Sequence, residues 1–245
     1  MAERMLFLPG WFLSPGTCEA IPGIHTALED LRKRFKVDIF SWPWVAHRAD
    51  MPPTWQGSVH AIIESLTPET HVVCMGAATG QLLMALGKMG GIARSCVCAG
   101  FSVPPATLRS LNMPSQAVAA AAMFRWRSSY QYMRLVMEDA DEEHWNRLAA
   151  LADADIDWAT TAVVQRSLED LDLEEEQPRL TIPALYLDSP LTVSGFAEMT
   201  EVFRRYAPAA AVQQLSVWPG RLHDQETGRD LSQKVLAFIQ ALPAA

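Results

Sequence analysis

The sequence has 245 residues, of which 49% are hydrophobic and 20% charged, and its mean hydropathy is +0.04. This composition is typical of a globular protein with one large core. The net charge of -8 is repelled by phosphate backbones and argues against a nucleic-acid partner. No apolar run approaches the roughly 18 residues of a transmembrane helix, so we expect neither a membrane span nor a membrane partner.

The four cysteines, at positions 18, 74, 96 and 98, lie mostly in apolar runs. Cys96-Val-Cys98 lacks the CxxC spacing of a redox or zinc motif. The residues from Met1 to Phe7 are too few, and too soon followed by Pro9-Gly10, to form a signal peptide. We therefore expect reduced thiols in a cytoplasmic protein without a metal or cofactor.

Short apolar runs alternate with helical patterns over the first hundred residues. The predicted strands cover residues 5–8, 37–42, 71–75 and 93–101. The apolar spacing between them predicts helices over residues 18–35, 55–66 and 81–88. Strand–helix alternation with short loops is typical of a doubly wound, mostly parallel sheet with helices on both faces.

The pattern changes after residue 105, where helical stretches continue without a convincing strand. Alternation resumes after this stretch. We predict strands over residues 182–187 and 212–218, and helices over residues 196–206 and 230–242. A sheet interrupted by a helical insertion is typical of a cap on an α/β core. We predict one core formed by residues 1–105 and 181–245, and a helical cap formed by residues 106–180.

The segment Gly76-Ala77-Ala78-Thr79-Gly80 separates a predicted strand from a predicted helix. Small residues at its first, third and fifth positions suit a sharp turn with a strained central residue, where the two glycines let neighbouring backbone approach. A serine at the centre of this turn acts as a nucleophile in G-x-S-x-G sequences. Here the central residue is Ala78, so we expect no acyl-enzyme from this chain.

These features resemble the α/β-hydrolase superfamily, and among its members the compact bacterial carboxylesterases of the pimeloyl-carrier-protein methyl ester esterase type. The resemblance covers essentially the whole chain. It rests on Leu-Pro-Gly-Trp at 8–11, the turn at 76–80, the helical cap and a histidine after the last predicted strand. It implies an esterase or thioesterase scaffold that works through a Ser-His-Asp mechanism.

The resemblance also assigns roles to individual residues. Ala78 occupies the nucleophile position, and His223 is the general base. The backbone N–H groups of Trp11 and Thr79 form the oxyanion hole. Asp188 is the candidate acid, although the loop after its strand is short for this family. The sequence Asp-Ser-Pro is equally a good turn starter, and both interpretations of Asp188 stay open.

Two explanations for Ala78 also stay open. A serine replaced deliberately would leave a disabled hydrolase of a carboxylic ester or thioester, and the retained His223 and Asp188 favour this explanation. Alternatively, the fold has naturally abandoned covalent catalysis, which is favoured by the short acid loop and by Pro9 in place of the family's histidine. The chain would then be a lyase or cyclase with His223 as base, or a ligand-binding pseudoenzyme.

The cap sequence predicts one helix through Met123–Met137, with methionines and aromatic residues on one face and arginines beside them. This face either packs on the core or forms an apolar wall for an acyl or aromatic substrate. In the second case the arginines would steer a carboxylate or an acidic carrier protein. The candidate substrate-binding residues are Trp126, Tyr130, Met133, Arg127 and Arg134.

Overall fold

A six-stranded, fully parallel sheet forms the centre of the computed structural model, in the order β2-β1-β3-β4-β5-β6. The structure describes residues 3–45, 50–123, 125, 127–188, 199–216 and 221–243. The strands are β1 (Glu3–Leu8), β2 (Phe35–Ile39), β3 (Thr70–Met75), β4 (Ser95–Ala99), β5 (Ala184–Asp188) and β6 (Ala211–Gln214). The predicted α/β fold class is confirmed.

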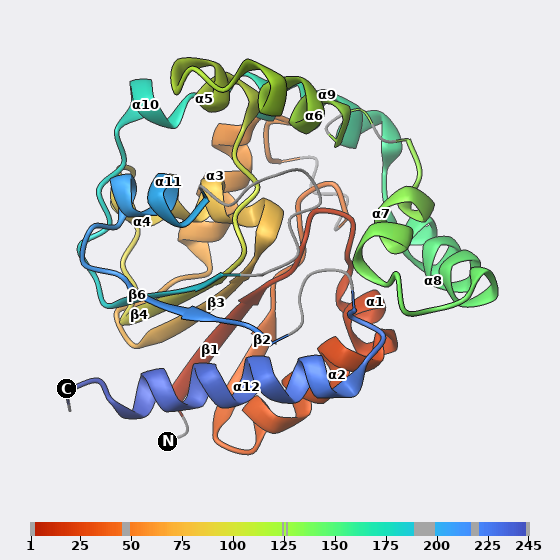
Figure 1. The fold of residues 1–245 in the computed structure, drawn as a ribbon, viewed down its shortest axis with the longest axis horizontal. Helices are drawn as coiled ribbons and strands as arrows, with labels where there is room; N and C mark the ends of the chain where they lie inside the picture. The colour runs from red at the N-terminus through yellow and green to blue at the C-terminus, as the bar shows by residue number, and fades with distance from the viewer. Residues whose placement is uncertain are drawn as a thin grey trace.

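Helices cover both faces of this sheet (Figure 1). On one face α12 (Gln225–Gln240) runs along α2 (Pro22–Arg32), which follows α1 (Pro15–Ala20). The other face carries α3 (Trp55–Glu64), α4 (Thr79–Gly87) and α11 (Met199–Tyr206). Because both faces are covered, all six side chains of the central strand β3 are buried.

The helices between β4 and β5 lie beyond the carboxyl ends of the strands, at the top and right of Figure 1. They are α5 (Pro105–Ser110), α6 (Pro114–Met123), α7 (Ser129–Val136), α8 (Glu142–Asp155), α9 (Trp158–Glu169) and α10 (Leu173–Glu176). We call these helices and their connections the cap. Ligands of open α/β sheets bind at this edge, so the cap covers the expected site.

The prediction of one helix through Met123–Met137 is wrong, because α6 and α7 are separate helices. Ser128, directly before α7, has extended backbone angles (φ -152°, ψ 153°). The N–H of Ser129 donates to the Asp153 carboxylate of α8 at 2.8 Å. The start of α7 is therefore fixed by a tertiary contact that the periodicity of residues 123–137 does not encode.

Candidate functional site

The turn between β3 and α4 places its strained residue at a different position from the one we predicted. The chain leaves β3 through a 3-10 turn, η1 (Gly76–Ala78), and enters α4 at Thr79. Gly76 has a φ of +35°, in the left-handed region, whereas Ala78 has ordinary helical angles (φ -80°, ψ -10°). The expectation that Ala78 is the strained centre is wrong, because the helical turn already begins at residue 76.

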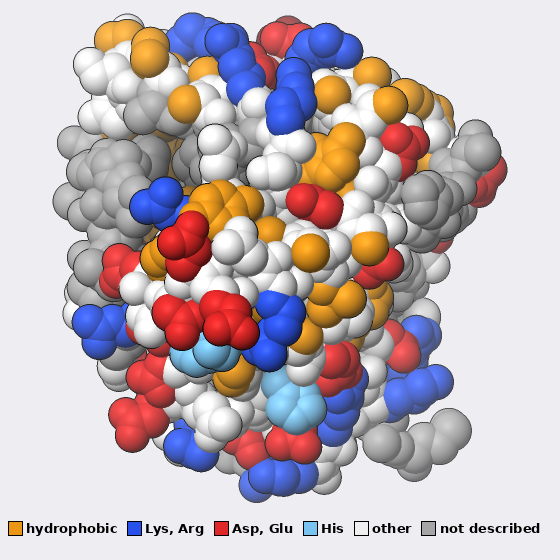
Figure 2. Space-filling model, turned by 90° about the vertical axis from the view of Figure 1, so that its right-hand side faces the viewer, with side chains coloured by type: hydrophobic (Ala, Val, Ile, Leu, Met, Phe, Trp, Pro, Cys, Tyr) orange, Lys and Arg blue, Asp and Glu red, His pale blue; other side chains and the backbone are white. Residues whose placement is uncertain are grey.

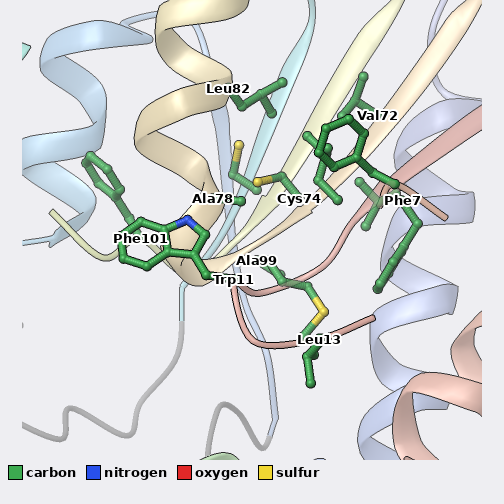
Figure 3. Close-up of a cluster of buried hydrophobic side chains, with 14 of the residues drawn as sticks. Phe7, Trp11, Leu13, Val72, Cys74, Ala78, Leu82, Ala99 and Phe101 are labelled. Atoms are coloured by element: carbon green, nitrogen blue, oxygen red, sulfur yellow. The ribbon is translucent and has the colours of Figure 1, made fainter. Parts of the chain in front are cut away.

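The side chain of Ala78 is fully buried. Figure 3 shows it among core residues that include Cys74, Leu82 and Trp11. Gly76 and Ala77 retain partial exposure. A side chain at position 78 therefore lies within the hydrophobic cluster, and the exposed part of the turn is at positions 76 and 77.

Thr79, the expected oxyanion donor, is engaged within the turn itself. Its backbone N–H donates to the carbonyl of Gly76, closing the 3-10 turn. Its hydroxyl donates to the carbonyl of Gly100 at 3.0 Å. The early helical turn therefore already uses this donor, and whether it also serves an oxyanion stays a prediction.

The expected close approach of backbone at the second glycine is not observed. A Cβ added to Gly80 would lie 3.6 Å from Pro104 Cγ, an ordinary van der Waals contact. A Cβ added to Gly76 would meet only the Ser102 hydroxyl, at 4.0 Å. Of these two positions, only position 76 requires a glycine, because its φ is positive.

The loop that carries Trp11 lies against the start of α4, and whether the Trp11 N–H serves an oxyanion stays a prediction. The Trp11 indole N–H donates to Gln81 Oε1 at 2.6 Å, and the Gln81 amide donates to Ser58 Oγ at 2.5 Å. Two further indoles hold the loop backbone: Trp42 donates to the Pro9 carbonyl and Trp44 to the Trp11 carbonyl. These bonds join residues that are 23 to 70 positions apart in the chain.

Tyr132 of the cap lies directly on this loop, and our predictions did not include it. Its hydroxyl occupies the space where a Cβ at Gly10 would lie. Its ring packs on Phe12, with centroids 5.4 Å apart, and Phe12 also stacks on Trp158 of α9. Burial raises the pKa of Tyr132 well above its usual range, so the hydroxyl stays protonated. The one indication of this role in the sequence is that Tyr132 directly precedes Met133, which we predicted to bind substrate.

His223 lies just before α12, as predicted, and residues of the cap lie beside it. Its ring meets that of His144 of α8 nearly edge-on, with centroids 4.8 Å apart. Its Nδ1 is buried and has no hydrogen-bond partner in the described part of the chain. A triad acid binds the base at Nδ1, so the expected bond from His223 to Asp188 is not formed.

Asp139, in the connection from α7 to α8, faces the backbone of the His223 loop. Burial raises the pKa of its carboxyl group. Its own N–H, the charge of His223 and the N–H groups of His223 and Asp224 lower that pKa to a smaller extent. The same connection forms an antiparallel bridge between Met137 and Arg221. The cap therefore holds the loop of the expected base.

Asp188 is the last residue of β5 and half-buried. Its carbonyl accepts the N–H of Leu215, so its backbone continues the pairing of β5 with β6. The structure does not bring it to His223 Nδ1. Whether it serves as an acid stays a prediction.

The candidate residues of the cap contact other parts of the cap. Met133 is buried and Tyr130 half-buried. Arg134 stacks over the rings of Tyr130 and Trp145, at 5.9 and 5.4 Å. Arg127 donates to Gln165 of α9 at 3.2 Å. Trp126 lies outside the described residues.

The face that Figure 2 shows carries basic side chains together at its upper edge and acidic side chains mainly below them. The acidic side chains share this face with hydrophobic and basic ones rather than forming a separate patch. No helix in the described part of the chain is long and apolar enough to cross a membrane. Among the same residues, no group of three His, Cys, Asp or Glu side chains is placed to hold a metal ion.

The four cysteines are free and buried. Burial raises the thiol pKa of Cys18 and Cys74 far above the usual range. Because the thiolate is the reactive form, these two side chains are packing residues rather than nucleophiles.

The structure is similar to solved structures of several enzymes. A hydrolase from Oleispira antarctica matches with a TM-score of 0.70 at 14% identity, over 99% of this chain and 92% of that one. A bromoperoxidase from Bacillus anthracis matches with a TM-score of 0.71 at 15% identity, over 98% and 92%. An esterase from Exiguobacterium antarcticum matches with a TM-score of 0.69 at 13% identity, over 98% and 94%. No family model and no curated protein matches the sequence.

These matches span nearly the whole chain and agree with its parallel sheet. The chain has the α/β-hydrolase fold. In α/β-hydrolases the nucleophile lies on a sharp strand-to-helix turn at the top of the sheet. In this chain that turn follows β3, and its positive-φ residue is Gly76, which has no side chain.

Proposed function

We propose that this chain is a non-hydrolytic protein of the α/β-hydrolase fold, which binds a small apolar or acyl-bearing molecule beneath its cap without a covalent intermediate. One observation carries the proposal: the positive-φ position of the turn is Gly76, and Ala78 is buried in helical conformation. Neither residue has a nucleophilic group. Covalent catalysis from position 76 or 78 therefore has no nucleophilic atom.

The alternative of a disabled ester or thioester hydrolase requires that a serine at position 78 would be active. A serine hydroxyl at this position would lie among Cys74, Leu82 and the other core residues of Figure 3. The Ala78 side chain it would replace is fully buried. The position of Ala78 therefore supports a natural loss of covalent catalysis over a deliberate replacement of serine.

The side chains between cap and core support an apolar ligand. Phe12, Tyr132 and Trp158 form a ring cluster over the loop that carries Trp11. Met133, next to Tyr132, is buried. Aromatic and methionine side chains of this kind line sites for apolar groups.

The experiment compares covalent labelling by a fluorophosphonate probe in three proteins: the wild type, Ala78→Ser and Gly76→Ser. We expect no labelling of the wild type or of Ala78→Ser, because a hydroxyl at 78 is buried. Gly76→Ser places a hydroxyl at the partly exposed position of the turn and is the variant in which labelling is expected to increase. Labelling and ester hydrolysis by Ala78→Ser would show instead that the chain is a disabled hydrolase.

Ligand binding is tested separately by thermal shift with octanoic acid and its methyl ester. A ligand that binds only the folded state raises the unfolding temperature. We expect an increase for the wild type and a smaller one for Phe12→Ala, which opens the ring cluster. An unchanged unfolding temperature with both compounds would contradict a site for acyl chains.

A second candidate function is general-base catalysis by His223. Its Nδ1 has no hydrogen-bond partner among the described residues, and Asp139 lies beside its loop. A neutral imidazole with a nearby carboxylate can remove a proton from a bound molecule. The probe is 5-nitrobenzisoxazole, whose ring opens on proton removal. We expect the wild type to accelerate the opening and His223→Ala to lose the acceleration. Equal rates for both proteins would exclude this function.

A further inference from the structure

We propose that Gln165 of α9 binds the polar end of the ligand, by donating its side-chain amide N–H to a carbonyl or carboxylate oxygen beneath the cap. The inference rests on the proposed function and deepens it, since it adds a hydrogen-bond donor to a site whose apolar part is the ring cluster. The ligand class is then an apolar group that carries an acceptor oxygen, such as a ketone or a carboxylic acid.

The Gln165 side chain is a buried amide of which one end is bonded and the other is not. The residue is 2% exposed, and its Oε1 accepts from the guanidinium of Arg127 at 3.2 Å. Its Nε2 is buried and has no hydrogen-bond partner among the described residues. A buried amide nitrogen without an acceptor is unfavourable, because it has given up its bonds to water. Gln165 therefore carries a donor that the described part of the fold does not use.

Arg127 determines which end of the amide is left unpaired. A guanidinium has N–H donors and no acceptor, so the amide end that faces it must be the oxygen. The opposite orientation would direct the NH2 group of Gln165 at the N–H groups of Arg127. The unpaired atom is therefore the nitrogen, and the group that satisfies it is an acceptor oxygen. The positive charge of Arg127 beside the amide also favours an acceptor that is negatively charged.

Gln165 shares a face of α9 with Trp158 of the ring cluster. The two residues are seven positions apart, which is two helical turns, and Thr161 between them is also buried. Side chains of a helix lean toward its N-terminus, which directs Gln165 toward Trp158. Trp158 stacks on Phe12, with ring centroids 5.7 Å apart. The unpaired amide therefore lies on the helix face that the proposed ligand contacts.

The other cap helix of the ring cluster also carries an unpaired polar atom. Ser129, at the start of α7, is fully buried, and its Oγ has no hydrogen-bond partner in the described part of the chain. Ser129 lies three residues before Tyr132 and hence on the same face of α7. Each cap helix that contributes a ring to the cluster thus has an unused polar atom on the same face. Apolar rings with a few polar atoms among them are typical of small-molecule sites.

The test compares the binding of three probes with a similar carbon skeleton: butylbenzene, 4-phenylbutan-2-one and 3-phenylpropionate. Butylbenzene has no oxygen, the ketone has a neutral acceptor, and 3-phenylpropionate has a carboxylate. Dissociation constants are measured by NMR titration of the whole chain. We expect the wild type to bind the two oxygen-bearing probes about three- to tenfold more tightly than butylbenzene, the usual effect of one hydrogen bond. Equal affinity for the three probes would overturn the role of Gln165.

Two variants of Gln165 and one control assign this preference to the amide. Gln165→Met keeps the length of the side chain and removes both N–H donors. Gln165→Glu also removes them but keeps an oxygen for Arg127, so it serves if the first variant fails to fold. We expect both variants to lose the preference for the ketone, and Gln131→Met, at an exposed position of α7, to retain it. A preference that survives in either folded Gln165 variant would overturn the proposal.

The side-chain amide signals of Gln165 give a direct measurement in the wild type. They are followed by NMR during addition of butylbenzene and of 4-phenylbutan-2-one. We expect the ketone to move the amide proton signals downfield, as a new hydrogen bond does, and butylbenzene to lack this effect. The same response to both probes would overturn the proposal.

This proposal and the proposed function can fail separately. Fluorophosphonate labelling of Ala78→Ser would refute the non-hydrolytic function and leave Gln165 as a substrate-binding residue. Equal affinity for the three probes would leave the apolar site intact and refute the role of Gln165. Absence of binding by all three probes would refute both.

Discussion

The Tyr132 hydroxyl fills the space beside Gly10 that any side chain at position 10 would need. This contact joins helix α7 of the cap to the loop after β1. It leaves no space for a side chain at position 10, whatever the backbone conformation there. The cap is therefore seated on the loop that carries Trp11. A substitution at either residue should therefore alter the packing of the other.

We predict that Gly10→Ala lowers the free energy of unfolding by about 1–3 kcal/mol, the usual cost of overpacking. In Tyr132→Phe the hydroxyl that blocks the added methyl group is absent, so Gly10→Ala should cost less in that background. Urea unfolding of the two single variants and the double variant measures the coupling. If the changes in unfolding free energy of the two single variants simply add in the double variant, the contact between Gly10 and Tyr132 is contradicted.

The two glycines of the turn should respond to alanine in opposite directions. Gly76→Ala forces an alanine into positive φ and should destabilise the protein by about 1–2 kcal/mol. Gly80→Ala lies inside α4 with room for a methyl group and should stabilise it by about 0.5–1 kcal/mol. Thermal and urea unfolding check both values. A cost at Gly80 as large as that at Gly76 would refute the assigned turn geometry.

Gln81 joins the Trp11 indole to Ser58 within the core. Gln81→Leu should destabilise the protein by about 1–3 kcal/mol, because the buried indole N–H loses its acceptor. Gln240→Leu, at the exposed end of α12, serves as the matched control and should change the free energy of unfolding by less than about 0.5 kcal/mol. Equal effects at the two positions would argue against the bond as the cause.

His71 should make stability depend on pH. Burial lowers its pKa in the folded state, and Arg94 lowers it further while Glu3 opposes the shift. The unfolded chain therefore binds the proton more readily, so stability is lost as pH falls below about 6.5. We expect urea midpoints to decrease between about pH 7.5 and 5.5, and His71→Asn to reduce the decrease. His60→Asn, at an exposed position, should retain the wild-type dependence.

Much of the fold could be predicted from local patterns in the sequence. Apolar runs marked the inner strands most clearly, because a parallel strand covered on both faces must be apolar at nearly every position, as β3, β4 and β5 are. The edge strands β2 and β6 are more exposed and less apolar. The position of the strand-to-helix turn followed from its small residues. His223 before the last helix followed from topology.

The sequence by itself therefore determined the α/β architecture and the absence of a nucleophilic side chain at position 78. Only the tertiary structure decided that the strained residue is Gly76, that α6 and α7 are separate, and that His223 meets His144. The physical reason is the range of the interactions. Strand and helix patterns depend on near neighbours, whereas these features depend on contacts between residues far apart in the chain.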